Sequence, residues 1–131
     1  MTFAMRAGDE LTPLVKEPVT RLQLVKYAGA SGDFNPIHWD PDRGREMGLD
    51  GVIAHGMLSM GFLGQYAAGV AGPRAIRRLK VRFGAMVRPG DVLTCRGVVR
   101  SVEGSRAVVD VWAENANGET VTRGEAEVEI E

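Results

Sequence analysis

The chain has 131 residues, of which 44% are hydrophobic and 25% charged, and its formal net charge is −1. This length and composition are typical of one folded domain, which we expect to span residues 1–131. With so small a charge and no basic tract, neither nucleic acid nor an acidic membrane is expected as the main partner. The single cysteine, Cys95, excludes an internal disulfide and fits a reducing compartment. No signal-peptide pattern opens the sequence, so a cytoplasmic protein is expected.

Capping and turn residues predict two helices in the first half of the chain. Thr20 fits the N-cap of a capping box, and the helix that follows should end at Gly29 or Gly32. A second, short helix is expected between Asp40, which precedes a proline, and Gly48. The apolar residues that the first helix should bury are Leu22, Val25 and Ala28.

Residues 51–73 carry no charged side chain, although they include His55, Gln65 and six glycines. The segment is long enough to cross a bilayer, but these residues make it only mildly apolar. We therefore expect a helix that the rest of the domain buries on nearly all sides. Strands should approach it closely at its small residues, which are Gly61, Gly64, Ala67, Ala68, Gly69 and Ala71.

From residue 79 the apolar residues alternate with polar ones, which is the period of a β-strand. Strands are predicted at residues 79–87, 92–100, 106–114 and along the C-terminal segment, with a hairpin at Asn117-Gly118. A further strand is expected near Val15 to Val19. The order of these elements predicts an α+β domain, in which an antiparallel sheet wraps around the uncharged helix.

The stretch GDFNPIH, residues 32–38, permits two interpretations. Aspartate, asparagine and proline are turn formers, and on spacing alone a plain turn is slightly favoured. In the alternative, Pro36 fixes the loop so that Asp33 and His38 converge on one water molecule. A carboxylate and an imidazole can exchange protons with such a water while it adds to a polarised double bond.

His55 and Gly56 stand where the uncharged helix should begin. The first amides of a helix lack intrahelical partners, and glycine allows a ligand to approach the chain. The Gly56 amide can thus stabilise an oxyanion, although an isolated His-Gly pair is more often only a helix start. A metal site built from His38, Asp40 and His55 is a weaker alternative, because Asp40 is better used as a helix cap.

Two stretches taken together resemble the signature of a known family. YAGASGDFNPIHWD (residues 27–40) followed by GVIAHGM (residues 51–57) resembles the MaoC-like dehydratases, also called (R)-specific enoyl-CoA hydratases or hydratase 2. VRFGAMVRPGDVLTCRGVV (residues 81–99) resembles the strand pattern of this family around its PGD turn. Within the family, the chain is most similar to the catalytic subunit of the (3R)-hydroxyacyl-carrier-protein dehydratases.

The resemblance implies the hot-dog fold, in which an antiparallel sheet wraps around a long central helix. It makes Asp33 and His38 the catalytic pair that holds water, Asn35 a support for their loop, and Gly56 the oxyanion amide. It also implies an enzyme of fatty acid metabolism with no metal and no other cofactor. A homodimer is expected, or else a heterodimer with a related subunit, in which this chain is the catalytic one.

The expected activity is reversible syn hydration of trans-2-enoyl thioesters to (R)-3-hydroxyacyl thioesters of coenzyme A or acyl carrier protein (ACP). Two alternatives are a hot-dog acyl-thioesterase and a non-catalytic subunit that binds acyl thioesters. A loose basic group surrounds the first predicted strand of the second half. By default it is a solvated face that the glutamates of the last strand balance; in the alternative, some of its members meet the phosphates of coenzyme A or the acidic surface of ACP. Its residues are Arg74, Arg77, Arg78, Lys80, Arg82 and Arg88.

Overall fold

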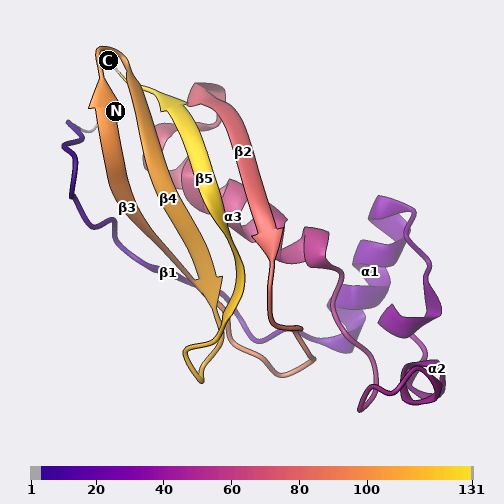
Figure 1. The fold of residues 1–131 in the computed structure, drawn as a ribbon. Coiled ribbons are helices and arrows are strands. Elements are labelled where there is room, and N and C mark those ends of the chain that lie inside the picture. Colours follow the sequence, from indigo (N-terminus) through magenta and orange to yellow (C-terminus); the bar gives the residue numbers. More distant parts are fainter. Residues whose placement is uncertain (1–3, 131) are drawn as a thin grey trace.

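The computed structural model describes residues 4–130, so residues 1–3 and Glu131 of the expected domain lie outside the described part. Five antiparallel strands form one curved sheet in the order β1-β3-β4-β5-β2 (Figure 1). The predicted strand at residues 106–114 and the predicted antiparallel sheet are confirmed. The strands are β1 (Leu14–Val15), β2 (Ile76–Phe83), β3 (Thr94–Glu103), β4 (Arg106–Glu114) and β5 (Thr120–Glu129).

The longest helix, α3 (Gly56–Ala71), lies across one face of this sheet (Figure 1). It buries apolar side chains such as Phe62 and Leu63, which join Val99, Val111 and other inward-facing strand residues in one core. This burial of apolar area is the main stabilising contribution to the domain. The α+β class and the hot-dog arrangement, an antiparallel sheet with a long helix packed against it, are thus confirmed. Among residues 4–130, no helix has the length and apolar character needed to cross a membrane.

The burial of α3 is less complete than the sequence suggested. Gly61, Gln65 and Gly69 are exposed, and a β-carbon placed on either glycine would have no atom within 4 Å. Gly64 does face the sheet, since a β-carbon there would lie 3.7 Å from Leu79. The expectation that α3 is covered on nearly all sides was wrong, because the sheet of this chain covers only one side of the helix.

Helices α1 (Arg21–Ser31) and α2 (Pro41–Glu46) and the 3-10 helix η1 (Pro36–His38) lie beyond one end of the sheet (Figure 1). As predicted, the Thr20 hydroxyl accepts a hydrogen bond from the Gln23 amide at 3.0 Å, and Gly32 ends α1 with a left-handed φ of 75°. The predicted inward face was partly wrong, because Leu22 and Val25 are 62% and 52% exposed. Ala28 is buried as predicted, but Leu24 is buried in place of the other two, since only one edge of α1 meets the domain.

Three strands have other limits than the sequence predicted, and one of them, β3, spans Thr94–Glu103 instead of residues 92–100. β2 ends at Phe83 because the chain then leaves the sheet, and Val87 accepts a hydrogen bond from the Ala54 amide at 2.8 Å. A β-carbon on Gly84 would lie 2.7 Å from the Thr120 carbonyl oxygen, so this departure requires glycine. β1 has only two residues, and a second 3-10 helix, η2 (Pro73–Ala75), precedes β2.

Two buried acidic groups predict how stability depends on pH. Burial raises the pKa of the Cys95 thiol from 9.0 to about 11. Burial, with a smaller contribution from Cys95, raises the pKa of the Tyr66 phenol from 10.0 to about 12. The folded chain therefore keeps protons that the unfolded chain has lost, so the free energy of unfolding should fall between pH 9 and pH 12. Urea denaturation across this range measures it, with Cys95→Ala showing a shallower fall; a free energy that rises with pH would contradict the assignment.

Candidate active site

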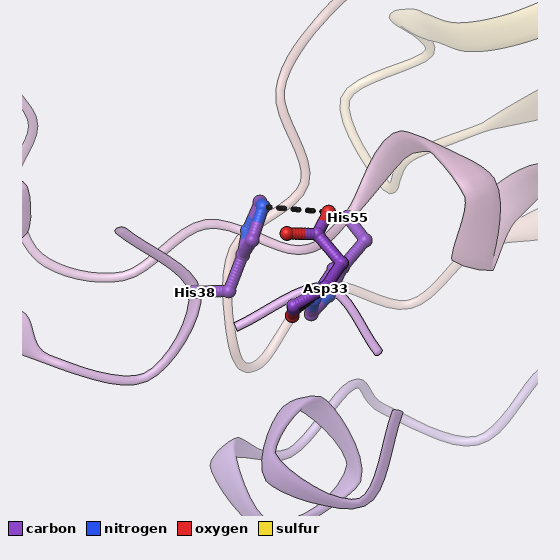
Figure 2. A group of neighbouring side chains, drawn as sticks. All are labelled: Asp33, His38 and His55. Carbon is purple, nitrogen blue, oxygen red and sulfur yellow. Dashed lines mark hydrogen bonds and ion pairs between the residues drawn. The ribbon is translucent and has the colours of Figure 1, made fainter. Parts of the chain in front are cut away.

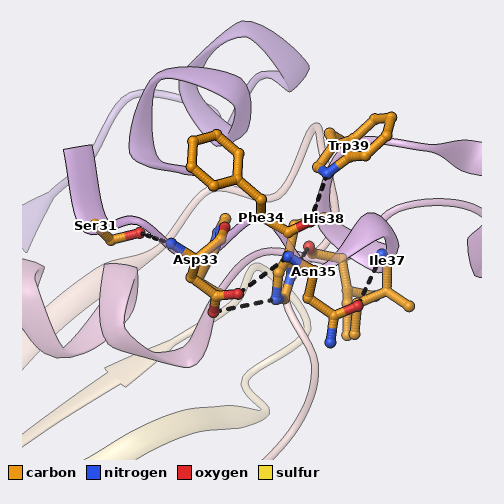
Figure 3. A network of polar contacts seen from close by, with 9 residues as sticks. Ser31, Asp33, Phe34, Asn35, Ile37, His38 and Trp39 are labelled. Atoms are coloured by element: carbon orange, nitrogen blue, oxygen red, sulfur yellow. Dashed lines mark hydrogen bonds and ion pairs between the residues drawn. The ribbon is translucent and has the colours of Figure 1, made fainter. Parts of the chain in front are cut away.

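The loop between α1 and η1 is held by hydrogen bonds between its own residues (Figure 3). One carboxylate oxygen of Asp33, Oδ1, accepts from the Asn35 amide at 3.2 Å, and Asn35 Oδ1 accepts from the Ile37 amide at 3.3 Å. Pro36 begins η1 directly after these turns, because its fixed φ favours the first position of a helix. The predicted turn is present, and Asn35 lies at its centre.

His38 ends η1 and is buried, whereas the Asp33 side chain is half exposed. The Nδ1 atom of His38 lies 2.7 Å from the carbonyl oxygen of Ile53. A carbonyl can only accept, so Nδ1 carries the proton and Nε2 of the neutral ring presents a lone pair. This Nε2 lies 3.8 Å from Asp33 Oδ2, the carboxylate oxygen that the turn leaves free (Figure 2).

The separation of Asp33 Oδ2 and His38 Nε2 determines what the pair can do. At 3.8 Å the two atoms are too far apart for a direct hydrogen bond. Both are acceptors, and a single water molecule between them can donate one hydrogen to each. The arrangement is therefore suited to hold and deprotonate a water molecule.

A second histidine, His55, completes the cluster (Figure 2). Its Nε2 donates to the Asp33 backbone oxygen at 3.0 Å, and its ring stacks on that of His38 with centroids 3.7 Å apart. Tyr27 meets the same ring edge-on at 4.9 Å. Sequence reasoning assigned His55 only to the metal alternative and missed this role, because the contacts join residues far apart in the chain.

The metal alternative named the wrong carboxylate. Asp40 caps α2 by accepting from the Asp42 amide at 3.1 Å, while Asp33 is the acidic residue whose ligand atom lies within 4.8 Å of those of His38 and His55. A metal ion binds in the plane of each imidazole, along the nitrogen lone pair. The rings of His38 and His55 are nearly parallel, at 22°, so their lone pairs do not converge on one ion. The geometry favours a water molecule over a metal ion.

Gly56 is the first residue of α3 and directly follows His55. Its amide belongs to the first turn, whose N–H groups carry the positive end of the helix dipole. The residue is exposed, and a β-carbon on it would lie 3.1 Å from the Phe83 ring at the end of β2. A side chain at this position would therefore crowd Phe83 and fill the approach to the amide.

A buried pair of hydroxyl groups ties this first turn to the sheet. Ser59 Oγ donates to the Gly56 carbonyl at 2.8 Å and lies 2.5 Å from Thr122 Oγ1 in β5. Because the Ser59 proton is used on Gly56, the Thr122 hydroxyl is the donor between the two. The carbonyl group of Gly56 is therefore connected to the sheet through the hydroxyl groups of Ser59 and Thr122. Nothing in the sequence signalled this pair, whose members are 63 positions apart.

A family of known proteins shares the sequence that contains Asp33, His38 and His55. A family model described as "MaoC like domain" matches residues 2–121. The chain belongs to the MaoC-like dehydratase family. The match contains the whole Asp33, His38 and His55 cluster as well as Gly56.

Among curated relatives, a fatty acid synthase beta subunit, hexB of Dothistroma septosporum, is 34% identical over 122 residues. That match covers 90% of this chain but only 6% of the synthase, so the chain spans a small part of such relatives. The (R)-specific enoyl-CoA hydratase of Rhodospirillum rubrum is 31% identical over 115 residues, which are 86% of this chain and 80% of that protein.

A solved structure shows how far the fold is shared. The R-hydratase PhaJ1 from Pseudomonas aeruginosa is 28% identical and superimposes with a TM-score of 0.83. The alignment covers 96% of this chain and 82% of PhaJ1. The fold is thus shared over nearly the whole of this chain.

The Ser59–Thr122 pair can be tested by a double-mutant cycle. Ser59→Ala should lower the free energy of unfolding by about 1 to 3 kcal/mol, because it leaves the buried Thr122 hydroxyl without an acceptor. Thr122→Val removes that hydroxyl at nearly constant shape, so the double variant should lose less than the sum of the single losses. Urea denaturation of the four proteins gives the coupling, and strictly additive losses would contradict a hydrogen bond between the two groups.

Proposed function

We propose that the protein catalyses the reversible syn addition of water to trans-2-enoyl thioesters, which yields (R)-3-hydroxyacyl thioesters. The observation that carries this proposal is the 3.8 Å gap between two acceptors, Asp33 Oδ2 and His38 Nε2. A hydratase needs a bound water, a base and a proton for carbon, and this pair provides for all three. The relative named (R)-specific enoyl-CoA hydratase supports both the reaction and coenzyme A as the carrier. ACP remains the alternative carrier.

The proposed reaction balances without oxidation or reduction. The water held by Asp33 and His38 attacks C3 of the enoyl group as the pair accepts one of its protons. The electron pair of the double bond moves to the thioester oxygen, where the Gly56 amide stabilises the enolate. The pair then returns a proton to C2 from the same side, so hydroxyl and hydrogen add to one face. We propose that no metal and no redox cofactor takes part.

Hydration of crotonyl-CoA, followed by the loss of the conjugated enoyl absorbance, tests the proposal. Asp33→Asn and His38→Ala should each lower kcat by about 100-fold or more, as expected when a general acid–base group is lost. Asp40→Asn is the matched control, because it changes a nearby carboxylate that only caps α2 and asparagine caps a helix equally well.

Other results would reject the proposal. Release of free coenzyme A thiol, detected with a thiol reagent, would indicate a thioesterase. Binding of crotonyl-CoA and longer enoyl-CoAs without turnover at any chain length would indicate a non-catalytic subunit. Unchanged rates in both Asp33→Asn and His38→Ala would exclude the proposed water-binding pair.

We further propose that this site is completed by a second chain, either a copy of this one or a related subunit. Large apolar side chains stand exposed beside the site residues: Phe34 next to Asp33 is 61% exposed, and Met57 next to Gly56 is 54% exposed. Phe83, which lies against Gly56, is also 54% exposed. Apolar side chains grouped around a polar site mark an interaction surface, and covering them would exclude bulk solvent from the site while the reacting water stays bound between Asp33 and His38.

The expected assembly of the pure protein is a dimer. Light scattering during size-exclusion chromatography should give twice the mass of the chain, and Phe83→Lys should reduce that mass and the hydratase rate together. The control Val15→Lys adds the same charge at another exposed apolar residue, on the opposite edge of the sheet from β2. A monomer with undiminished hydratase activity would contradict completion of the site by a second chain.

A further inference from the structure

The outer face of the sheet, opposite α3, is covered with charged side chains, most of which are paired. Arg100 contacts both Asp110 and Glu125, the latter at 2.7 Å. Two more such pairs are Arg96 with Glu114 at 2.5 Å and Arg106 with Glu127 at 3.6 Å. Across most of this face, therefore, each guanidinium group has a carboxylate to neutralise it.

One position departs from this pattern. Arg82 in β2 and Arg123 in β5 are directly opposite each other in the strand register, so their side chains project from the same face. Among residues 4–130, neither of them forms an ion pair with a carboxylate. Like charges directly opposite each other destabilise a pair of strands. The two arginines thus carry an unneutralised charge that a bound anion would offset.

The two arginines also border a hollow. A concavity of about 260 Å³ is lined by Arg82, Phe83, Gly84, Thr120 and Arg123. Guanidinium groups present several N–H donors in a planar fork, which matches the oxygens of a phosphate. The hollow therefore combines positive charge, donors and room for a phosphate group.

The hollow adjoins the catalytic end of the molecule. Phe83 lines it and at the same time lies against Gly56, where a β-carbon would be 3.1 Å from the ring. Phe83, at the end of β2, would therefore lie between an anion held by Arg82 and Arg123 and the first turn of α3. A flexible carrier arm that passes Phe83 would connect such an anchor to the Gly56 amide.

We propose that Arg82 and Arg123 bind a phosphate ester of the carrier that delivers the acyl thioester. The proposal rests on the hydratase function proposed above and assigns the carrier contact to two residues. Two other members of the basic group are engaged elsewhere, since Arg77 pairs with Glu129 and Arg78 lies 4.0 Å from Glu127. The phosphate is either the one that coenzyme A shares with ACP, on the pantetheine arm, or one of the nucleotide portion of coenzyme A.

The test compares KM values for three thioesters that differ in phosphate content: crotonyl-CoA, crotonyl-4′-phosphopantetheine and crotonyl-pantetheine. Arg82→Gln and Arg123→Gln should each raise KM for crotonyl-CoA about tenfold, the loss expected for one charge-assisted hydrogen bond. The values of kcat, and the KM for crotonyl-pantetheine, should stay unchanged. The melting temperature should not fall, because each substitution removes a like-charge contact.

Arg106→Gln serves as the control, since it removes an arginine of the same face that is paired with Glu127. It should leave all KM values unchanged. A tenfold rise with crotonyl-4′-phosphopantetheine identifies the phosphate of the pantetheine arm, and a rise with crotonyl-CoA alone identifies the nucleotide portion; both support the proposal. Equal KM values for the wild type and both arginine variants with crotonyl-CoA would overturn it.

A direct binding measurement separates this proposal from the hydratase function. Calorimetry with coenzyme A, which cannot be hydrated, should show weaker binding to Arg82→Gln than to the wild type, also about tenfold. If the wild type hydrates no thioester but still shows this difference, the hydratase function fails and the phosphate site stands. If hydration occurs and coenzyme A binds equally to both proteins, only the phosphate site fails.

Discussion

The hydrogen bond from His38 Nδ1 to the Ile53 carbonyl is the interaction on which the candidate site depends. It fixes the tautomer of a buried imidazole, so that the lone pair of Nε2 faces the carboxylate of Asp33. Without it, the ring could present an N–H group to Asp33 and close the gap with a direct hydrogen bond. With the proton held on the other nitrogen, the 3.8 Å separation fits a bridging water.

The rest of the fold keeps the partners of this hydrogen bond in place. The stacked ring of His55 lies against His38 and holds the Asp33 backbone, while the sheet anchors the first turn of α3 through Thr122 and Ser59. The proposed water-binding pair and the proposed oxyanion amide are thus held by separate contacts that meet at the His55-Gly56 step. His55 and Gly56 are held in place because the residues on both sides of this step are packed and hydrogen-bonded.

Sequence reasoning succeeded where the determining interactions are local. Asx turns, proline at a first helical position and the period of strands depend on a few neighbouring residues, so the loop around Asn35 and the strand at residues 106–114 were predictable. The inward face of α1 was not predictable, because the exposure of Leu22 and Val25 depends on how the whole helix lies against the domain. Nor were the Ser59–Thr122 bond and the stacking of His55, which join segments brought together only by the fold.

We propose that Asp33 and His38 hold one water molecule and deliver its hydroxyl and a proton from the same side. Hydration of crotonyl-CoA in deuterated water, with the product analysed by NMR coupling constants, tests it most directly. The proposed mechanism predicts an (R)-3-hydroxybutyryl thioester in which the deuterium at C2 and the hydroxyl at C3 were added to the same face. Addition to opposite faces would contradict it, because one pair of groups on one side of the substrate cannot produce that outcome.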